Sequence, residues 1–379
     1  MQSRAIYNSE HELFRENVRR FFRAELEPNI DQWEEQSVVP RSLWNKAAEN
    51  GFLCCGVPEE FGGPGADFLY NMVLSEETGY AIGGASVGFS VQADIVAYYL
   101  MSAGTEEQKQ YWLPKMVTAE QIAAIGMTEP GVGSDLKNLR TSAVRDGDDY
   151  VINGQKTFIT NGQNCDFVLV ACTTDPSKGG HGISLIIVEC DRPGFSRGRN
   201  LDKIGQKAAD TSEMFFQDVR VPMSNLVGEE GEGFSIMMRE LPRERITIAC
   251  RAQAEAQRAF DLTVAYTKER KAFGKTIADF QNTQFVLADI KTSLEVGWAY
   301  LDQCIKKCDE GILTPEEGAM AKLWTTENEG KVVDQCLQLF GGYGYMREYP
   351  ISRIYVDARV RRIYGGTSEI MKLVIGRSL

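Results

Sequence analysis

The 379-residue chain has only two histidines, His11 and His181, and little else from which a metal centre could be built. Its nine cysteines include no CxxC pair, and the adjacent Cys54 and Cys55 do not follow a zinc or disulfide spacing. With so few histidines, the sequence does not favour a histidine-based metal site or a Ser/His/Asp hydrolase. We expect no metal ion, and we expect reduced, mostly buried thiols.

Positive charge is also scarce, because 41 Lys and Arg stand against 53 Asp and Glu, which gives a net charge of -12. Nucleic acid and anionic membranes bind clustered basic residues, so neither partner is expected. No apolar run approaches the roughly 18 residues of a membrane span. Glu10, Glu12 and Glu16 are unlike the acid-poor start of a transit peptide. We expect a cytoplasmic, bacterial protein.

The first part of the chain has the spacing of helices. Leu13, Val18, Phe21 and Phe22 recur at intervals near three and four, before Pro28. Further helices are expected over residues 41–50, 68–81, 88–103 and 106–117. The pattern predicts an all-helical first domain.

After the first helical part, the sequence changes to stretches rich in β-forming residues, which are separated by turn dipeptides. These dipeptides supply positive φ cheaply and predict several antiparallel hairpins. They are Asp146-Gly147, Asn153-Gly154 and Asn161-Gly162. A β-barrel or sandwich from about 123 to 225 is the expected fold of this part.

A helical period returns after the glycine-rich connector GEEGEGF, with Phe234, Met237, Met238 and Leu241 on one stripe. Pro242 lies in this pattern and predicts a bend or break, because proline has no N–H for the helix. Long helices are expected over 243–270, 280–308 and 315–340. Helices of this length with short connectors pack as a bundle.

Two glycine-containing motifs have the appearance of ligand loops. Residues 125–135, IGMTEPGVGSD, lack the third glycine of a dinucleotide fingerprint, but their glycines and the hydroxyls of Thr128 and Ser134 suit a flavin ring or pyrophosphate. An isolated run of this kind is more often a surface loop. In the second motif, GKT at 274–276, Glu269 stands where a phosphate-binding loop needs glycine, so that interpretation fails. Arg270 remains, either as a phosphate ligand or as a solvated helix end.

Four motifs in order carry a family resemblance: MTEPGVGSD, KTFITNG, RKAFGK and QLFGGYGYMREYPISRIYVDARVRRIYGGTSE. Together they resemble the acyl-CoA dehydrogenases over nearly the whole chain, closest to the long-chain and isovaleryl-CoA branches. The resemblance implies a mainly α fold with a central β domain. Its parts are an N-terminal helical domain (1–122), a middle β-barrel (123–230) and a C-terminal four-helix bundle (231–379).

The resemblance also implies FAD as the cofactor and a homotetramer built as a dimer of dimers. Phe158 would lie against the flavin, although a strand-core role is the alternative from the residues alone. Implied FAD contacts within the chain are Ile125, Met127, Thr128, Gly133, Ser134, Phe158, Ile159, Thr160, Thr367 and Glu369. Contacts implied from a neighbouring subunit are Arg270, Phe273, Gln281, Gln338, Leu339, Gly341 and Gly342.

The family's catalytic carboxylate is missing at one position, because Gly365 stands there. In the long-chain and isovaleryl branches the base is on the bundle helix, at the position of Glu244. From the residues alone, RELPRER is a charged helix face, and Glu240 is a competing carboxylate four residues earlier whose position does not match. The implied substrate contacts are Ser134, Ser235, Arg243, Arg245, Gly365 and Gly366.

The implied reaction is α,β-dehydrogenation of an acyl-CoA thioester to a trans-2-enoyl-CoA, as in fatty acid β-oxidation. Glu244 would take the α-proton while a hydride leaves for flavin N5, and the Gly365 N–H would bind the thioester oxygen. Electrons would pass to an electron-transfer flavoprotein. Alternatives are a flavin oxidase or monooxygenase of the same fold, and a non-enzymatic helical scaffold. The acyl chain stays open, with medium-to-long or branched chains favoured.

Overall fold

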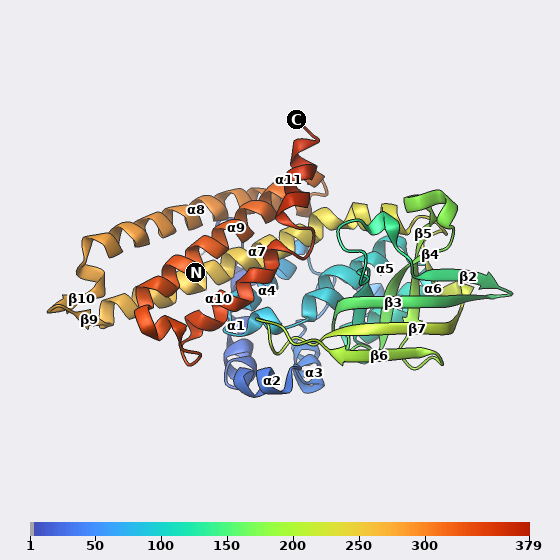
Figure 1. Cartoon of the computed structure of the whole chain (residues 1–379), viewed down its shortest axis with the longest axis horizontal. Helices are drawn as coiled ribbons and strands as arrows, with labels where there is room; N and C mark the ends of the chain where they lie inside the picture. The colour runs from blue at the N-terminus through green and yellow to red at the C-terminus, as the bar shows by residue number, and fades with distance from the viewer. Residues whose placement is uncertain (1–3) are drawn as a thin grey trace.

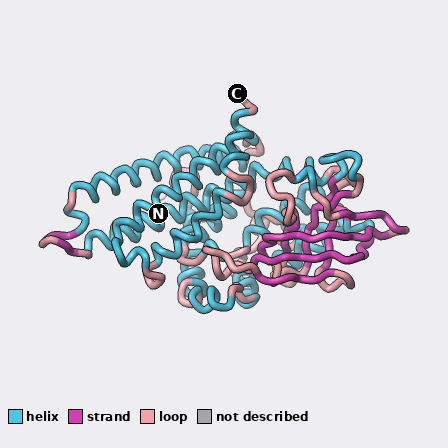
Figure 2. Tube along the Cα trace, in the orientation of Figure 1, coloured by secondary structure: helices cyan, strands magenta, loops and turns pink. Residues whose placement is uncertain are grey.

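The computed structural model describes residues 4–379, so the first three residues of the expected first domain lie outside the described residues. Helices occupy one end and the middle of an elongated molecule, and a sheet occupies the other end (Figures 1 and 2). The expected mainly helical fold with a central β domain is confirmed.

The first part of the chain is helical as expected. Its α-helices are α1 (Ser9–Phe21), α2 (Ile30–Gln36), α3 (Arg41–Glu49), α4 (Phe68–Tyr80), α5 (Ala97–Ala103) and α6 (Glu106–Val117). Asn8 caps α1 by accepting the N–H groups of Glu10 and His11, and Asp67 caps α4 in the same manner. The expected helix over 88–103 is confirmed: the chain is helical from residue 89, continues as a π-helical segment Val91–Val96 and leads into α5.

Eight strands form one sheet in the order β6-β7-β3-β2-β4-β5-β8, with β1 parallel to β4. They are β1 (Ala123–Gly126), β2 (Ser142–Asp146), β3 (Asp149–Thr160), β4 (Phe167–Thr173), β5 (Ile183–Glu189), β6 (Phe195–Asn200), β7 (Thr211–Pro222) and β8 (Leu226–Val227). The expected Asp146-Gly147 hairpin is confirmed, because β2 pairs antiparallel with β3 across it.

The other two expected hairpins do not form. Asn153-Gly154 lies inside β3, where the register against β7 shifts. Gly154 has φ +149, and a Cβ there would lie 2.6 Å from the Thr141 hydroxyl, so the glycine serves a bulge and a close approach of side chain to backbone. Asn161-Gly162 ends β3, but β2 separates β3 from β4, so the turn joins strands that are not neighbours.

The last part of the chain is a helical bundle with a small hairpin at its tip. Its helices are α7 (Gly233–Glu269), α8 (Gln281–Asp309), α9 (Pro315–Phe340), α10 (Pro350–Ala358) and α11 (Ser368–Gly376), and the hairpin strands are β9 (Lys271–Ala272) and β10 (Lys275–Thr276). Thr314 and Glu317 form a capping box at the start of α9. α7 packs along α8, α9 and α4.

Of the expected bend or break at Pro242, the break is wrong, because α7 runs through this residue from Gly233 to Glu269. Pro242 is buried, and Gly318 of α9 packs closely against it: a Cβ at Gly318 would lie 3.0 Å from the Pro242 carbonyl oxygen. Packing against α9 therefore offsets the lost helix hydrogen bond. Two members of the expected apolar stripes are also misplaced, because Leu13 and Met238 are exposed.

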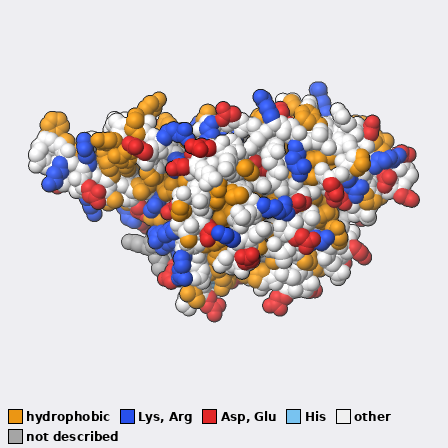
Figure 3. All heavy atoms as spheres, turned by 90° about the horizontal axis from the view of Figure 1, so that it is seen from below, with side chains coloured by type: hydrophobic (Ala, Val, Ile, Leu, Met, Phe, Trp, Pro, Cys, Tyr) orange, Lys and Arg blue, Asp and Glu red, His pale blue; other side chains and the backbone are white. Residues whose placement is uncertain are grey.

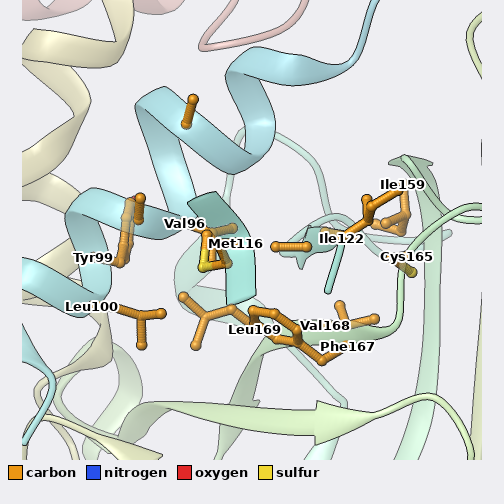
Figure 4. Packing of buried hydrophobic residues seen from close by; sticks show 14 of the residues in the cluster. Val96, Tyr99, Leu100, Met116, Ile122, Ile159, Cys165, Phe167, Val168 and Leu169 are labelled. Carbon is orange, nitrogen blue, oxygen red and sulfur yellow. The ribbon is translucent and has the colours of Figure 1, made fainter. Parts of the chain in front are cut away.

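One hydrophobic core joins the first helices to the sheet. In Figure 4, Leu100 of α5 lies beside Leu169 of β4, and Val96 and Met116 lie next to each other above Leu169; Tyr99 of α5 belongs to the same cluster. This packing fixes α5, and with it the orientation of Tyr99. None of the helices in the described part combines the length and apolar character that a bilayer crossing requires. Acidic and basic side chains are interspersed over the face seen in Figure 3.

Candidate active site

Glu244 lies on α7 and is buried, with 7% of its surface exposed. Its carboxylate accepts a hydrogen bond of 2.9 Å from the hydroxyl of Tyr99 on α5. Tyr99 is fully buried, so the hydroxyl has a fixed position. Two helices that are 145 residues apart in the chain thus meet at one carboxylate.

The environment of Glu244 places its ionisation near neutral pH. Burial raises its pKa to about 7, because a carboxylate loses hydration when it is enclosed. The Tyr99 hydrogen bond and the Arg243 charge oppose this rise, and the Glu240 charge adds to it. A general base is most effective when its pKa lies close to the working pH.

Glu240, one turn earlier on α7, is already paired. It forms ion pairs of 3.4 Å with Arg239 and 3.2 Å with Arg243. Arg243 in turn lies 3.3 Å from the ring centroid of Tyr98 and donates to the Asp94 carbonyl. Glu244, by contrast, has no ion pair within 4 Å anywhere in residues 4–379. Glu240 is bound in a structural network, and Glu244 is the carboxylate available for chemistry.

The late Gly365-Gly366 turn packs against α7 close to Glu244. A Cβ at Gly365 would lie 2.4 Å from the Cδ1 of Ile248, which is one helical turn beyond Glu244. Both glycines have positive φ, +65 and +97. Position 365 therefore contributes backbone groups rather than a side chain.

Two buried cations hold the carbonyl groups of this turn. Arg245 Nε donates to the Gly365 carbonyl at 3.5 Å, and Lys322 Nζ donates to the Gly366 carbonyl at 2.7 Å. The Gly365 N–H has no hydrogen-bond partner among the described residues. The turn is therefore fixed through its carbonyls, and an N–H donor is left for a ligand oxygen.

Sequence reasoning did not find Tyr99 and Lys322. Lys322 is fully buried, and burial together with the Arg245 charge lowers its pKa to about 8, so it remains mostly protonated at neutral pH. The available signal was weak: a lysine between Ala321 and Leu323 on the buried side of α9, and a tyrosine in an apolar helix.

The motif at 125–135 and strand β3 lie together. Thr157 N–H donates to the Thr128 carbonyl at 2.9 Å. Lys156 Nζ reaches both the Met127 carbonyl, at 3.1 Å, and the carboxylate of Glu129, at 2.9 Å. Lys156 and Glu129 are both buried, so this ion pair fixes the loop against the strand.

Phe158 projects from this assembly into solvent. Its side chain is 66% exposed and its backbone has φ +60, an uncommon conformation for an aromatic residue, while neighbouring Ile159 is 2% exposed. The strand-core alternative for Phe158 is therefore wrong. An aromatic face held outward by a strained backbone is suited to a flat ring ligand.

Other expected ligand residues lie on the Thr128–Ser134 loop, at the end of β3, at the start of α7 and after the Gly365-Gly366 turn. Ile125 and Thr160 are partly buried, and Gly133 and Ser134 are exposed. Lys137 lies over the ring of Phe234, 5.3 Å from its centroid, and so brings the loop of Ser134 to the start of α7. There Ser235 donates to the Glu232 carbonyl at 2.7 Å.

The last two expected cofactor residues on this side follow the Gly365-Gly366 turn. They are Thr367, which caps α11, and the exposed Glu369.

The remaining expected cofactor residues lie at the far end of the bundle. They gather around the ends of α7 and α9 and the start of α8, where Arg270 is 5.3 Å from the Tyr343 ring centroid. Phe273, at the β9–β10 tip, is 95% exposed. The β9–β10 tip lies at the end of the long axis that is far from the sheet in Figure 1. The group consists of Arg270, Phe273, Gln281, Gln338, Leu339, Gly341 and Gly342.

Three models of known protein families match the chain. Residues 8–120 match "Acyl-CoA dehydrogenase, N-terminal domain", residues 124–219 match "Acyl-CoA dehydrogenase, middle domain", and residues 231–379 match "Acyl-CoA dehydrogenase, C-terminal domain". The three matches together span most of the chain.

Individual relatives are similar over most of their length. The chain is 46% identical over 378 residues to the long-chain specific acyl-CoA dehydrogenase of rat (Rattus norvegicus) mitochondria, covering 99% of this chain and 88% of the relative. It is 37% identical over 374 residues to the caffeyl-CoA reductase-Etf complex subunit CarC of Acetobacterium woodii, covering 98% and 99%. A crystal structure of an acyl-CoA dehydrogenase from Geobacillus kaustophilus is 49% identical, with a TM-score of 0.97 and 99% of each chain covered.

Proposed function

The chain belongs to the acyl-CoA dehydrogenase family, and on that premise we propose that it converts an acyl-CoA thioester into a trans-2-enoyl-CoA. The observation that carries this proposal is Glu244, a buried carboxylate that is free of ion pairs among the described residues and lies beside the Gly365-Gly366 turn. We also assign three domains, 1–122, 123–230 and 231–379, which fit the change from helices to strands and back.

Glu244 accepts the α-proton of the substrate. The α-carbon of a thioester is weakly acidic, so its proton leaves only if a base is close and the developing negative charge on the thioester oxygen is stabilised. With a pKa of about 7, Glu244 is ionised in a large fraction of molecules at neutral pH. It can then accept the proton efficiently, because its pKa lies close to the working pH. Tyr99 fixes the carboxylate and favours its charged form.

The Gly365 N–H donates to the thioester oxygen. This N–H has no partner in residues 4–379, and the buried cations Arg245 and Lys322 hold the turn by its carbonyls. A fixed donor costs no reorganisation when charge develops, which is how an oxyanion hole lowers a barrier. Glycine fits here because the donor is the backbone, while the base comes from α7.

The residues present fit FAD, which when bound supplies the acceptor of the β-hydride. The exposed, strained Phe158 offers a face for a ring system, and the loop of Thr128 and Ser134 next to it offers hydroxyls and unhindered glycines. Contacts on this side are proposed for Ile125, Met127, Thr128, Gly133, Ser134, Phe158, Ile159, Thr160, Thr367 and Glu369. Ser134, Ser235, Arg243, Arg245 and Gly366 are proposed for the substrate.

Arg270 follows Glu244 by 26 positions along α7, about 39 Å along the helix axis, so the second group of cofactor residues is remote from the proposed base within one chain. We therefore propose that this end of one copy serves the site of a neighbouring copy, in a homotetramer built as a dimer of dimers. The exposure of Phe273 supports this, because an aromatic side chain that is 95% exposed at a hairpin tip is unfavourable in water and is stabilised when a second copy covers it.

We propose an electron-transfer flavoprotein as the electron acceptor. One relative is named as part of a complex with such a protein, and its name is that of a reductase, so the direction of the reaction depends on the electron partner. We also infer a cytoplasmic setting, since all nine cysteines are free thiols, as a reducing compartment requires.

The test is an anaerobic titration of the purified, FAD-loaded protein with a series of straight and branched acyl-CoA thioesters. We expect bleaching of the flavin absorbance and formation of the enoyl-CoA, followed by fast reoxidation with an electron-transfer flavoprotein and slow reoxidation by air. Fast reoxidation by air alone would favour an oxidase. A colourless protein that takes up no FAD would contradict the enzymatic proposal.

A further inference from the structure

One line of accessible side-chain surface leads along α7 away from Glu244. Every residue between Glu244 and Gln257 is buried, except Ile248 and Arg251, which keep part of their surface accessible. Positions 244, 248 and 251 follow each other at helical intervals of four and three, so the three side chains share one face of the helix. A substrate whose α-carbon meets Glu244 can therefore extend past Ile248 towards Arg251.

Arg251 has no hydrogen bond and no ion pair among the described residues. Its Nε is buried and without an acceptor, although an arginine presents five N–H donors. Burial lowers the pKa of this guanidinium, and the charge of Asp94 is the largest opposing influence. Arginine nevertheless stays protonated in proteins. The position is therefore a buried positive charge with its donors unused, which is costly unless an acceptor is supplied.

The neighbours of Arg251 connect it to the proposed site. The other groups whose charges act on it include Tyr364, which directly precedes the Gly365-Gly366 turn, and the cation Arg361. Burial raises the pKa of Tyr364, yet 37% of its surface is accessible. Arg251 and Tyr364 are therefore close enough for their charges to interact, beside the Gly365-Gly366 turn.

We propose that Arg251 recognises a carboxylate at the distal end of the acyl group, so that the preferred substrates are CoA thioesters of dicarboxylic acids. This inference rests on the proposed function. Seven residues separate Glu244 from Arg251, about 10 Å along the helix axis. Side chains on a helix tilt towards its N-terminus, which brings the guanidinium back towards Glu244.

A carboxylate fits Arg251 better than an apolar chain end or a hydroxyl. Its two oxygens accept two parallel N–H donors of the guanidinium, whereas a hydroxyl accepts one and a methyl group accepts none. Asp94 is not the carboxylate that accepts from the Arg251 guanidinium. Its carboxylate accepts from Asn71 at 2.8 Å and forms no ion pair with Arg251 in residues 4–379.

A purely structural role for Arg251 makes a different prediction. If Arg251 only balances the charge of Asp94, a terminal carboxylate on the substrate gains nothing and is repelled by Asp94. The enzyme would then prefer the monocarboxylic thioester of the same length.

The experiment compares matched pairs on the FAD-loaded wild-type protein: adipyl-CoA with hexanoyl-CoA, suberyl-CoA with octanoyl-CoA, and sebacoyl-CoA with decanoyl-CoA. We expect at least one dicarboxylic member to have a kcat/KM about 10- to 100-fold higher than its partner, the effect of a charge-assisted hydrogen bond. Binding of the same pairs to the Glu244→Gln protein, measured by calorimetry, should show the same order of Kd without turnover.

Three variants assign the preference to the side chain. Arg251→Met should remove or reverse it, and Arg251→Lys should keep part of it. Arg258→Met is the matched control, since Arg258 lies two turns further along α7 against the Tyr80 ring, 4.9 Å from its centroid, and should leave the preference unchanged.

Equal or weaker use of every dicarboxylic thioester by the wild-type protein would overturn the proposal for Arg251 while leaving the dehydrogenase function intact. The proposal is overturned in the same way if Arg251→Met keeps the wild-type preference. Failure of all six thioesters to bleach the flavin would instead count against the proposed function itself.

Discussion

The two ends of α7 differ in how much of a binding site one copy of the chain supplies by itself. Around Glu244, the chain supplies the carboxylate, its Tyr99 partner, and a glycine turn held by Arg245 and Lys322, all buried or half-buried within one copy. Around Arg270, at the opposite end, the expected cofactor residues are mostly exposed, and the ring of Phe273 meets that of Phe280 only at a centroid distance of 6.2 Å.

The difference indicates a division of labour. Proton removal needs groups fixed to within fractions of an ångström, and such precision comes from burial in one packed core. Cofactor binding at the far end can use a surface that a second copy completes. A substitution at one end of α7 should therefore leave the other end unaffected.

The largest effect is expected from Glu244→Gln. Loss of the base should slow anaerobic flavin reduction by about 10² to 10⁴, the usual contribution of general-base catalysis. FAD content and oligomeric state should stay as in the wild type, because the Arg270 end is untouched. Glu240→Gln is the matched control one turn away, and a loss of equal size in that variant would break the assignment of the base.

A smaller loss is expected from Lys322→Met. The Gly366 carbonyl would lose its donor at 2.7 Å, and the turn that carries the Gly365 N–H would loosen. An unsatisfied carbonyl costs about 1–3 kcal/mol, so the maximal rate of flavin reduction should fall roughly 10-fold, with little change in substrate Kd. The exposed Lys331 on the same helix gives the control variant Lys331→Met. Equal rates in both variants would show that the cation is not needed to hold the turn.

Arg270→Met tests the far end of α7, where we expect an effect on FAD binding and not on the chemical step. We expect the FAD dissociation constant to rise about 10-fold, because a charged hydrogen bond to phosphate is lost. Flavin reduction per bound FAD should remain near the wild-type rate, as measured by stopped flow after saturation with FAD. If Arg270→Met binds FAD normally, the far end is not part of a cofactor site.

The smallest effect is a shift in pH dependence from Tyr99→Phe. The rate of flavin reduction should rise with pH as Glu244 loses its proton, with a midpoint near 7. The Tyr99 hydrogen bond lowers the pKa of Glu244, so its removal raises that pKa and moves the midpoint to higher pH by roughly one unit. Tyr111→Phe, at an exposed position, should leave the profile in place. A midpoint that moves to lower pH would contradict the proposed environment.

The sequence predicted the fold where local signals agree with tertiary packing. Helical spacing located the helices, and the order of four motifs indicated the family. It failed where packing overrides a local rule: Pro242 continues a helix because Gly318 packs against it, and Gly154 serves a bulge rather than a turn. The tight contact that decides each case is made by a residue distant in the chain.

The candidate site divides in the same manner. Glu244 and the Gly365 turn were predicted from motif positions, and the structure brings them to the same face of α7. Tyr99, Lys322 and Arg251 could not be predicted, because a tyrosine in an apolar helix or a cation on a bundle helix acquires a role only when helices far apart in sequence meet. Their partners are set by packing, which periodicity does not specify.

The most direct test of Glu244 as the base separates proton removal from hydride loss. An acyl-CoA with sulfur in place of the β-carbon can lose its α-proton but has no β-hydride to give. In heavy water, we expect the wild-type protein to exchange the α-protons of this compound for deuterium, as followed by NMR, and the Glu244→Gln protein to exchange them at least about 100-fold more slowly. Equal exchange rates in the two proteins would show that another group removes the proton.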